Sequence, residues 1–157
     1  MKKTFTILIA CLLFSCPALF AEDGVNLSSG QTVYVAIYSN VFTGPKEYPF
    51  NLAAMLSIRN TDLHNAITIT SAKYFSSTGK PLKEYAPKTI ILAPLASHYF
   101  SINETDETGG FGANFIVKWQ ASKEINTPII ESVMIGSRYG QGISFISHGK
   151  VITDKTQ

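Results

Sequence analysis

The stretch that decides the fold runs from residue 31 to residue 39 and reads Gln-Thr-Val-Tyr-Val-Ala-Ile-Tyr-Ser. Every second residue from Val33 to Ile37 is branched and apolar, and tyrosine or alanine stands between them. Side chains of a strand alternate between its two faces, and β-branched and aromatic residues favour strands. The stretch therefore predicts a β-strand with one face in a hydrophobic core.

The same period of two recurs along the rest of the chain. It is found in residues 51–59, 66–75, 89–93, 96–103, 113–120, 129–135 and 141–147. Residues 51–59 are also compatible with a short helix, and the apolar phase of residues 66–75 changes near Ser71, as a β-bulge would cause. Residues 76–80, Ser-Ser-Thr-Gly-Lys, have the composition of a hairpin turn. Trp119 shares a face with Phe115 and Val117, so we expect its indole in the core.

These strands and their turn signals predict an all-β fold with antiparallel pairing. Residues 41–49 and 104–112 are expected to be its longer loops, and the polar residues 150–157 are expected to fray. Residues 90–97, Ile-Ile-Leu-Ala-Pro-Leu-Ala-Ser, resemble the edge strand, proline turn and next strand of secreted immunoglobulin-like domains. We therefore expect a single immunoglobulin-like β-sandwich of about eight strands over residues 22–157, with its core in residues 30–150.

The first 21 residues have the features of a secretory signal peptide, with Lys2 and Lys3 before an apolar run and the small residue Ala21 at the end. Cleavage after Ala21 predicts a periplasmic or secreted protein. In the alternative, residues 13–16, Leu-Phe-Ser-Cys, act as a lipobox and Cys16 becomes a lipid-bearing N-terminus. Because a span needs about twenty apolar residues, we expect no transmembrane segment after signal removal.

Removal of the signal peptide would also change the number of cysteines and the net charge of the chain. Both cysteines, Cys11 and Cys16, lie within it, so cleavage after Ala21 leaves a chain without thiols. Disulfides, thiolate nucleophiles and cysteine zinc sites are then excluded. The net charge of +2 comes from Lys2 and Lys3, so residues 22–157 are neutral overall. A neutral domain lacks the basic footprint of nucleic-acid binding, and no nucleic-acid partner is expected.

Five stretches carry a family resemblance. They are GQTVYV at 30–35, FNLAAMLSIRNTD at 50–62, GGFGANF at 109–115, MIG at 134–136 and GQGISF at 140–145. Together they resemble the uncharacterised bacterial family called domain of unknown function 3124, over most of residues 30–150. The resemblance implies an exported bacterial protein, and it transfers no catalytic residues and no cofactor.

Residues that carry metal or phosphate chemistry elsewhere do not form their usual patterns here. His64, His98 and His148 lack the spacing of a metal site, so no metal is expected, and His98 is expected to face the core. Residues 109–112, Gly-Gly-Phe-Gly, precede a strand, whereas phosphate loops follow one and open a helix. We therefore interpret these glycines as a tight turn and expect no cofactor.

Two Ser-x-x-Lys sequences, beginning at Ser77 and Ser147, match the spacing of serine acylases. Those enzymes need a helix that places the lysine one turn beyond the serine. Pro81 and the hairpin composition forbid such a helix after Lys80, so we expect no catalytic serine at Ser77.

Two loops are candidates for binding. Arg138 and Tyr139 stand between glycines, where an arginine beside an aromatic ring can recognise a carboxylate or a sugar face. The residues 104–112 contain three carboxylates, and oxygen-rich extracellular loops can hold calcium, although three carboxylates at this spacing fall short of a calcium loop.

The function that these observations favour is an exported, non-catalytic binding or scaffolding module of the bacterial cell envelope, with an envelope protein or a glycan as partner. One alternative is an envelope hydrolase whose acids come together only in the fold. Its candidates are Glu84, Glu104, Asp106, Glu107 and Glu131. A second alternative is a lipid-anchored envelope accessory protein.

Overall fold

The computed structural model describes residues 26–44, 47–138 and 140–155. The predicted signal peptide, with Cys11 and Cys16, and the candidate Tyr139 lie outside these residues. The described residues form twelve β-strands and no helix, and all strand pairs are antiparallel, so the all-β prediction is confirmed. The strands are β1 (Leu27–Ile37), β2 (Asn40–Thr43), β3 (Tyr48–Asn51), β4 (Ala53–Arg59), β5 (Ile67–Phe75), β6 (Pro81–Glu84), β7 (Ile90–Leu92), β8 (Ser97–Ile102), β9 (Ala113–Asn126), β10 (Ile129–Arg138), β11 (Gln141–His148) and β12 (Lys150–Asp154).

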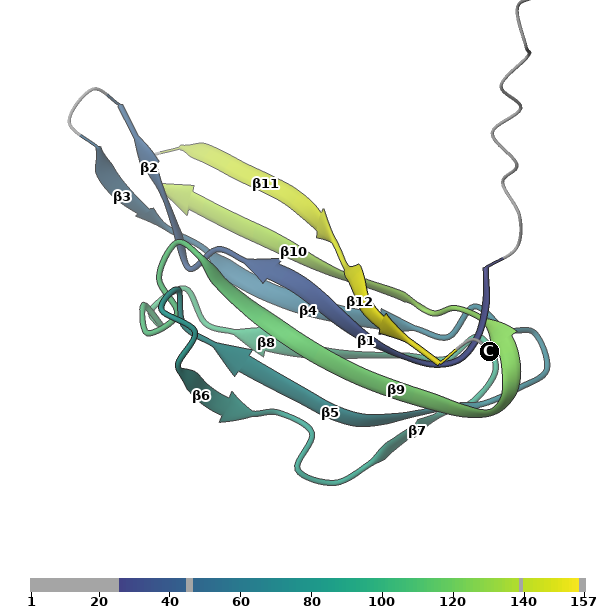
Figure 1. Cartoon of the computed structure of the whole chain (residues 1–157). Coiled ribbons are helices and arrows are strands. Elements are labelled where there is room, and N and C mark those ends of the chain that lie inside the picture. Colours follow the sequence, from purple (N-terminus) through teal and green to yellow (C-terminus); the bar gives the residue numbers. More distant parts are fainter. Residues whose placement is uncertain (1–25, 45–46, 139, 156–157) are drawn as a thin grey trace, which may run out of the picture.

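Two sheets lie face to face (Figure 1). The larger sheet has the order β12-β1-β9-β5-β6, with β7 also paired to β5, and the smaller has the order β11-β10-β4-β8. β2 and β3 form a separate hairpin that projects from one end. In the part of the chain that the structure describes, no helix is long and apolar enough to cross a membrane.

The inward side chains of both sheets form one core. Trp119, Tyr74 and Phe115 are its largest fully buried members, and the Trp119 side chain is only 2% exposed. The core prediction for Trp119 is therefore confirmed. The Tyr85 ring packs edge-on against Phe115 of the larger sheet and Phe100 of the smaller sheet, so it joins the two layers.

Three local predictions are confirmed. The pairing of β5 with β9 shifts register between Ile69 and Ser71, as the change of phase requires. The turn between β5 and β6 closes through a hydrogen bond from the Ser76 N–H to the Lys80 carbonyl, 2.9 Å. Gly79 takes a φ of +77° there, a conformation that favours glycine. Of the two alternatives for residues 51–59, the structure has the strand.

The expected number of strands was too low, because four short strands lack a period-two signal. β2 and β3 fall within residues 41–49 and their flanks, which were expected to be a loop. β6 directly follows the hairpin turn. β12 was expected to fray, and its five side chains are all exposed. Its backbone nevertheless pairs with β1, and the Asp154 carboxylate accepts hydrogen bonds from Ser28, 2.6 Å, and Gln31, 2.7 Å.

Candidate functional site

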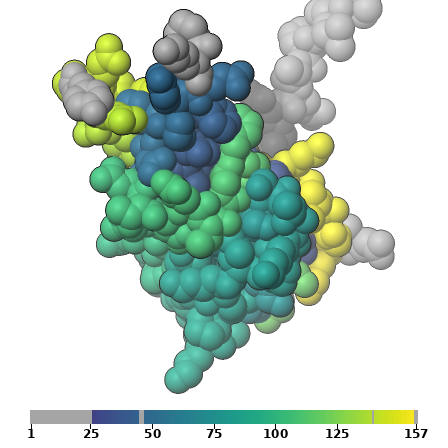
Figure 2. All heavy atoms as spheres, turned by 90° about the vertical axis from the view of Figure 1, so that its left-hand side faces the viewer, coloured from purple at the N-terminus to yellow at the C-terminus, as the bar shows by residue number. Residues whose placement is uncertain are grey.

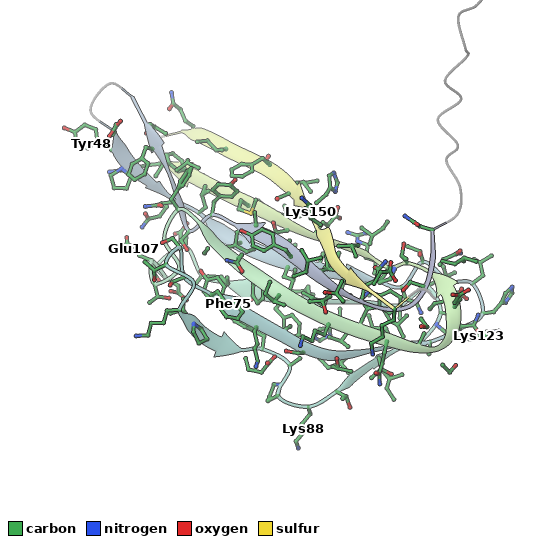
Figure 3. All side chains as sticks on the ribbon, in the orientation of Figure 1. Tyr48, Phe75, Lys88, Glu107, Lys123 and Lys150 are labelled. Carbon is green, nitrogen blue, oxygen red and sulfur yellow. The ribbon has the colours of Figure 1, made fainter. Side chains whose placement is uncertain are left out.

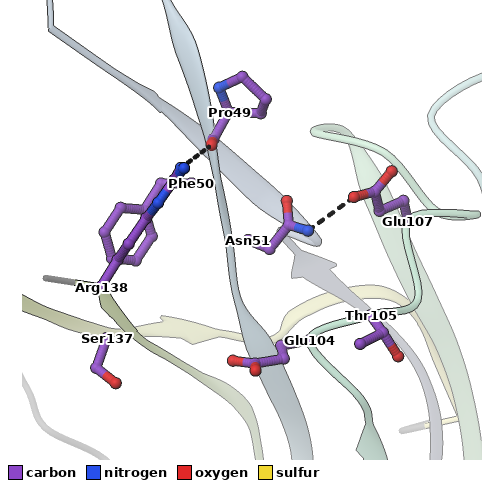
Figure 4. Close-up of a pocket in the computed structure, with 8 residues that line it drawn as sticks. All are labelled: Pro49, Phe50, Asn51, Glu104, Thr105, Glu107, Ser137 and Arg138. Atoms are coloured by element: carbon purple, nitrogen blue, oxygen red, sulfur yellow. Dashed lines mark hydrogen bonds between the residues drawn. The ribbon is translucent and has the colours of Figure 1, made fainter.

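A pocket of about 360 Å³ opens at the end of the sandwich that carries the β2–β3 hairpin (Figures 2 and 4). Three separate segments line it, namely β3, the loop between β8 and β9, and the end of β10. The lining residues are Pro49, Phe50, Asn51, Glu104, Thr105, Glu107, Ser137 and Arg138. The two binding loops that the sequence analysis proposed as alternatives therefore meet at one pocket.

The close approach of β10 to β3 brings Arg138 to the pocket. A Cβ at Gly136 would lie 2.6 Å from the Phe50 ring and 2.7 Å from the Asn51 carbonyl oxygen. Real Cβ atoms do not approach so closely, so only glycine allows the two strands to pass here. Phe50 is itself buried and anchors β3 on the core. Arg138 follows two residues beyond this contact, at the end of β10.

The Arg138 guanidinium lies at the pocket rim, where Nη1 donates a hydrogen bond to the Pro49 carbonyl oxygen, 3.3 Å (Figure 4). Arg138 pairs with Gln141 across the β10–β11 hairpin, and Gly140 has a φ of +76° in the turn. Arg138 is exposed at this position. Its predicted neighbour in binding, Tyr139, lies outside the described residues.

The loop between β8 and β9 supplies the negative charge of the pocket. Glu104 and Glu107 are both exposed, and Glu107 Oε1 accepts a hydrogen bond from Asn51 Nδ2, 2.7 Å. Figure 4 shows the Glu104 carboxylate pointing toward the side occupied by Ser137 and Arg138. A cationic wall thus faces two carboxylates across one opening.

Asp106 belongs to the same loop but has a different role, since it does not line the pocket. Its Oδ1 accepts hydrogen bonds from the N–H, 3.0 Å, and the hydroxyl of Thr108. Asn103 Oδ1 accepts equivalent bonds from Thr105, 3.0 Å each. These two turns shape the loop and leave Glu104 and Glu107 facing the pocket.

The glycines that follow are structural, as the tight-turn interpretation expected. A Cβ at Gly109 would overlap the hydroxyl of Tyr74, and Gly110 has a φ of +73°. Tyr74 and Ser39 share a hydrogen bond of 3.2 Å between their hydroxyl groups. Burial raises the pKa of Tyr74, the bond to Ser39 lowers it, and the charge of Asp106 raises it.

The other two acids of the predicted hydrolase lie elsewhere. Glu84 accepts hydrogen bonds from the N–H groups of Ala72, 2.8 Å, and Ala86, 3.1 Å, and from the Ser71 hydroxyl, 2.9 Å. It therefore holds the β5 bulge. Glu131 stands on the outer face of the smaller sheet, and its carboxylate lies 3.3 Å from His148 and 3.9 Å from Arg59. Of the five proposed acids, the structure brings only Glu104 and Glu107 into the pocket.

The histidines stay apart. His98 is half-buried on the inward face of β8 and packs edge-on against Phe100, 4.8 Å between ring centroids. His148 is exposed beside Glu131. No group of three or more His, Cys, Asp or Glu side chains suited to a metal ion occurs in residues 26–44, 47–138 and 140–155. Ser77 lies in the hairpin turn, without the helix that an acylase would need.

A second pocket, of about 310 Å³, lies beside the first, and the Arg138 and Phe50 side chains line both. Its other lining residues are Thr43, Tyr48 and Gln141. The β2–β3 hairpin that forms this wall was expected to be part of a loop. The signal that would have found it is Gly44-Pro45 between short apolar stretches, a pattern typical of a turn between two strands.

Among the residues that the structure describes, the largest pKa shift is that of Asp62, at the opposite end of the sandwich. Its carboxylate accepts hydrogen bonds from the backbone N–H groups of His64, 2.9 Å, Asn65, 2.8 Å, and Asn126, 3.3 Å, and from the Asn65 side chain, 2.8 Å. These bonds, chiefly the one from His64, lower the pKa of Asp62 to about 2, although burial raises it. The carboxylate thus joins its own loop to the end of β9, which is a structural role.

The fold and the pocket define the class of the protein, an antiparallel β-sandwich with an open, charged pocket at one end. The chain belongs to the family described as "Protein of unknown function (DUF3124)", whose profile matches residues 30–152. No curated protein matches it. A crystal structure titled Thermotoga maritima 1070 aligns with a TM-score of 0.45 and 9% identity, over 76% of this chain and 92% of that chain.

Proposed function

We propose that this protein is an exported binding module of the bacterial cell envelope, and that it engages its partner at the charged end of the sandwich. The observation that carries the proposal is the meeting of Arg138, Glu104 and Glu107 at one open pocket. These residues come from two loops far apart in the sequence, and a rigid pair of sheets holds both. Binding residues are often presented in this way, on loops above a packed frame.

The proposal includes an immunoglobulin-like arrangement. Its support is the step from β7 to β8, which leads from the edge of the larger sheet to the edge of the smaller one through the turn at residues 93–96. Strands that change sheets across such a turn are typical of Greek-key sandwiches.

Export rests on the N-terminal sequence alone. We propose cleavage after Ala21, and intact-mass measurement of the protein recovered from the periplasm or medium tests it. A mass equal to residues 22–157 is expected. A chain that begins at a lipid-bearing Cys16 would replace this part of the proposal with the membrane-anchored alternative.

The hydrolase alternative now depends on Glu104 and Glu107. A glycosidase needs one acid that stays protonated near neutral pH, usually because an apolar environment raises its pKa. Both side chains are exposed to solvent, and Asn51 donates a hydrogen bond to Glu107. Neither is buried among apolar side chains as such an acid usually is, so we propose binding ahead of acid catalysis.

The test is a pull-down from envelope extract with three immobilised proteins. They are residues 22–157, the double variant Arg138→Ala with Tyr139→Ala, and the control Arg59→Ala. The control also removes one of the two arginines, but from the outer face of the smaller sheet. We expect a partner that the parent and the control capture and the double variant loses. Equal capture by a folded double variant would reject this end as the binding surface.

A further inference from the structure

We propose that the pocket between Arg138 and the two glutamates binds a small zwitterion, an amino acid or a dipeptide with a free ammonium group and a free carboxylate. This inference rests on the proposed function and names the ligand class of the same site. The pocket volume of about 360 Å³ falls within the range of small-molecule sites.

The positive wall is suited to the carboxylate. Arginine presents N–H donors in a planar fork that matches a carboxylate, and the bond from Nη1 to the Pro49 carbonyl holds this guanidinium at the rim. Ser137, the preceding residue of β10, also lines the pocket, with its side chain directed away from Arg138 (Figure 4).

The negative wall is suited to the ammonium group. Glu104 and Glu107 line the opposite side, and the Asn51 amide fixes the Glu107 carboxylate through the 2.7 Å bond. An ammonium group has three donors and no acceptor, so carboxylate oxygens are its natural partners. Thr105 lies between the two acids in the sequence and also lines the pocket, and its hydroxyl donates to Asn103 Oδ1.

The arrangement disfavours ligands with one sign of charge. A phosphate or an acidic glycan would meet Arg138 but would also be repelled by two carboxylates within the same opening. A polyamine would meet the carboxylates but be repelled by the guanidinium. Only a ligand that carries both signs, separated along its length, complements both walls.

A panel of dipeptide probes tests each half of this recognition. We would titrate the ¹⁵N-labelled exported protein with L-alanyl-L-alanine, its N-acetyl form and its C-terminal amide, up to about 10 mM, a range in which millimolar binding is measurable. Binding should shift the amide resonances of Asn51, Glu107 and Ser137. Blocking either end should weaken binding at least about tenfold, as expected for the loss of one charge-assisted hydrogen bond.

Variants link each end of the probe to one wall. In Arg138→Ala the free dipeptide and its amide should bind equally, whereas in Glu104→Gln with Glu107→Gln the free dipeptide and its N-acetyl form should bind equally. Lys88→Ala, an exposed charge away from the pocket (Figure 3), should keep the parent's preferences. Unchanged resonances outside the pocket show that each variant is folded.

Absence of shifts at the pocket, or equal binding of free and blocked dipeptides to the parent, would overturn the inference. If the Arg138 and Tyr139 double variant still loses its envelope partner in that case, the proposed binding surface stands and only the zwitterion is wrong. If the double variant keeps the partner as well, both proposals fail.

Discussion

At the end of the sandwich beyond Arg59, the Asn60 and Asp62 side chains are buried and bonded to backbone groups, whereas at the other end Glu104 and Glu107 lie exposed around a pocket. Asn60 and Asp62 stand in the loop between β4 and β5, and Glu104 and Glu107 stand in the loop between β8 and β9. Figure 3 places Glu107 and Lys123 at these opposite ends. At one end, polar side chains are therefore buried and hydrogen-bonded within the fold. At the other end, polar side chains of similar type are exposed to solvent.

The bonded end, defined here as Asn60, Asp62 and the loops they contact, shows what a structural cluster looks like. Asn60 Nδ2 donates to the carbonyl oxygens of Asn65, 2.8 Å, Ala93, 3.0 Å, and Leu92, 3.3 Å. Its Oδ1 accepts from the Asp62 N–H, 3.0 Å. A lowered pKa often marks a functional carboxylate, but at Asp62 loop closure explains it fully.

The largest loss of stability is expected for a substitution in the core that both ends share. Trp119→Ala removes the largest side chain of the shared core and should cost about 3 to 5 kcal/mol of unfolding free energy, the usual range for a buried aromatic. Urea unfolding measures the loss, and the parent's emission should be blue-shifted because the indole is buried. Red-shifted emission with an unchanged midpoint would place Trp119 on the surface and contradict the core described here.

Asn60→Ala should have the next largest effect. It removes the Asn60 side chain, only 3% exposed, as the partner of the Asn65 and Leu92 carbonyl groups and of the Asp62 N–H, whereas the Ala93 carbonyl still accepts from the Ala96 N–H. Buried polar groups without partners are costly, and we expect a loss of about 2 to 3 kcal/mol by chemical denaturation. Asn51→Ala is the matched control from the pocket end, where the amide bonds an exposed carboxylate, and it should lose far less. Equal losses would remove the distinction between the two ends.

Asp62 should govern part of the acid sensitivity. Its pKa is about 2 in the fold against an ordinary 3.8, so its charged form is stabilised by folding. That contribution is present above pH 4 and is lost as the pH falls from about 4 to about 2. Melting temperatures measured across this range should fall less steeply for Asp62→Asn than for the parent. Asn51→Ala, which removes a side chain of the pocket and no titratable group, should retain the parent's slope, and a flattened slope in that control would contradict the comparison.

The sequence predicted the core better than it predicted the ends, for a physical reason. Burial on alternate positions gives the sequence a period of two, so β1, β5 and β9 were predicted. The bulge near Ser71 was also predicted, because it changes the phase of the apolar residues. β12 has five exposed side chains and owes its place to backbone pairing, which no side-chain pattern records. The β2–β3 hairpin was missed because each strand has only four residues.

The candidate site was predicted in parts but not as a whole. Arg138 and the acidic loop were each recognised from composition and flanking glycines. That they share one pocket follows from the order of β8, β4 and β10 in the smaller sheet and from the contact of Gly136 with Phe50. Such long-range neighbours leave no signal in local sequence. The same reason explains why Glu84 and Glu131 were grouped with acids that lie far from them.

The smallest expected effect concerns the pocket end itself. The double variant Arg138→Ala with Tyr139→Ala should change the free energy of unfolding by no more than about 0.5 kcal/mol, because Arg138 is a surface position away from the core. Arg138 is exposed, and its hydrogen bond to Pro49 is long, 3.3 Å. Gly109→Ala, at the same end, is the contrasting control, because its Cβ would displace the buried Tyr74 hydroxyl and should destabilise the fold. Unfolding of the double variant would show that Arg138 ties the β2–β3 hairpin to β10 as Asp62 ties its own loops. The polar residues at both ends would then have a structural role, and the proposal that the pocket is a binding surface would be rejected.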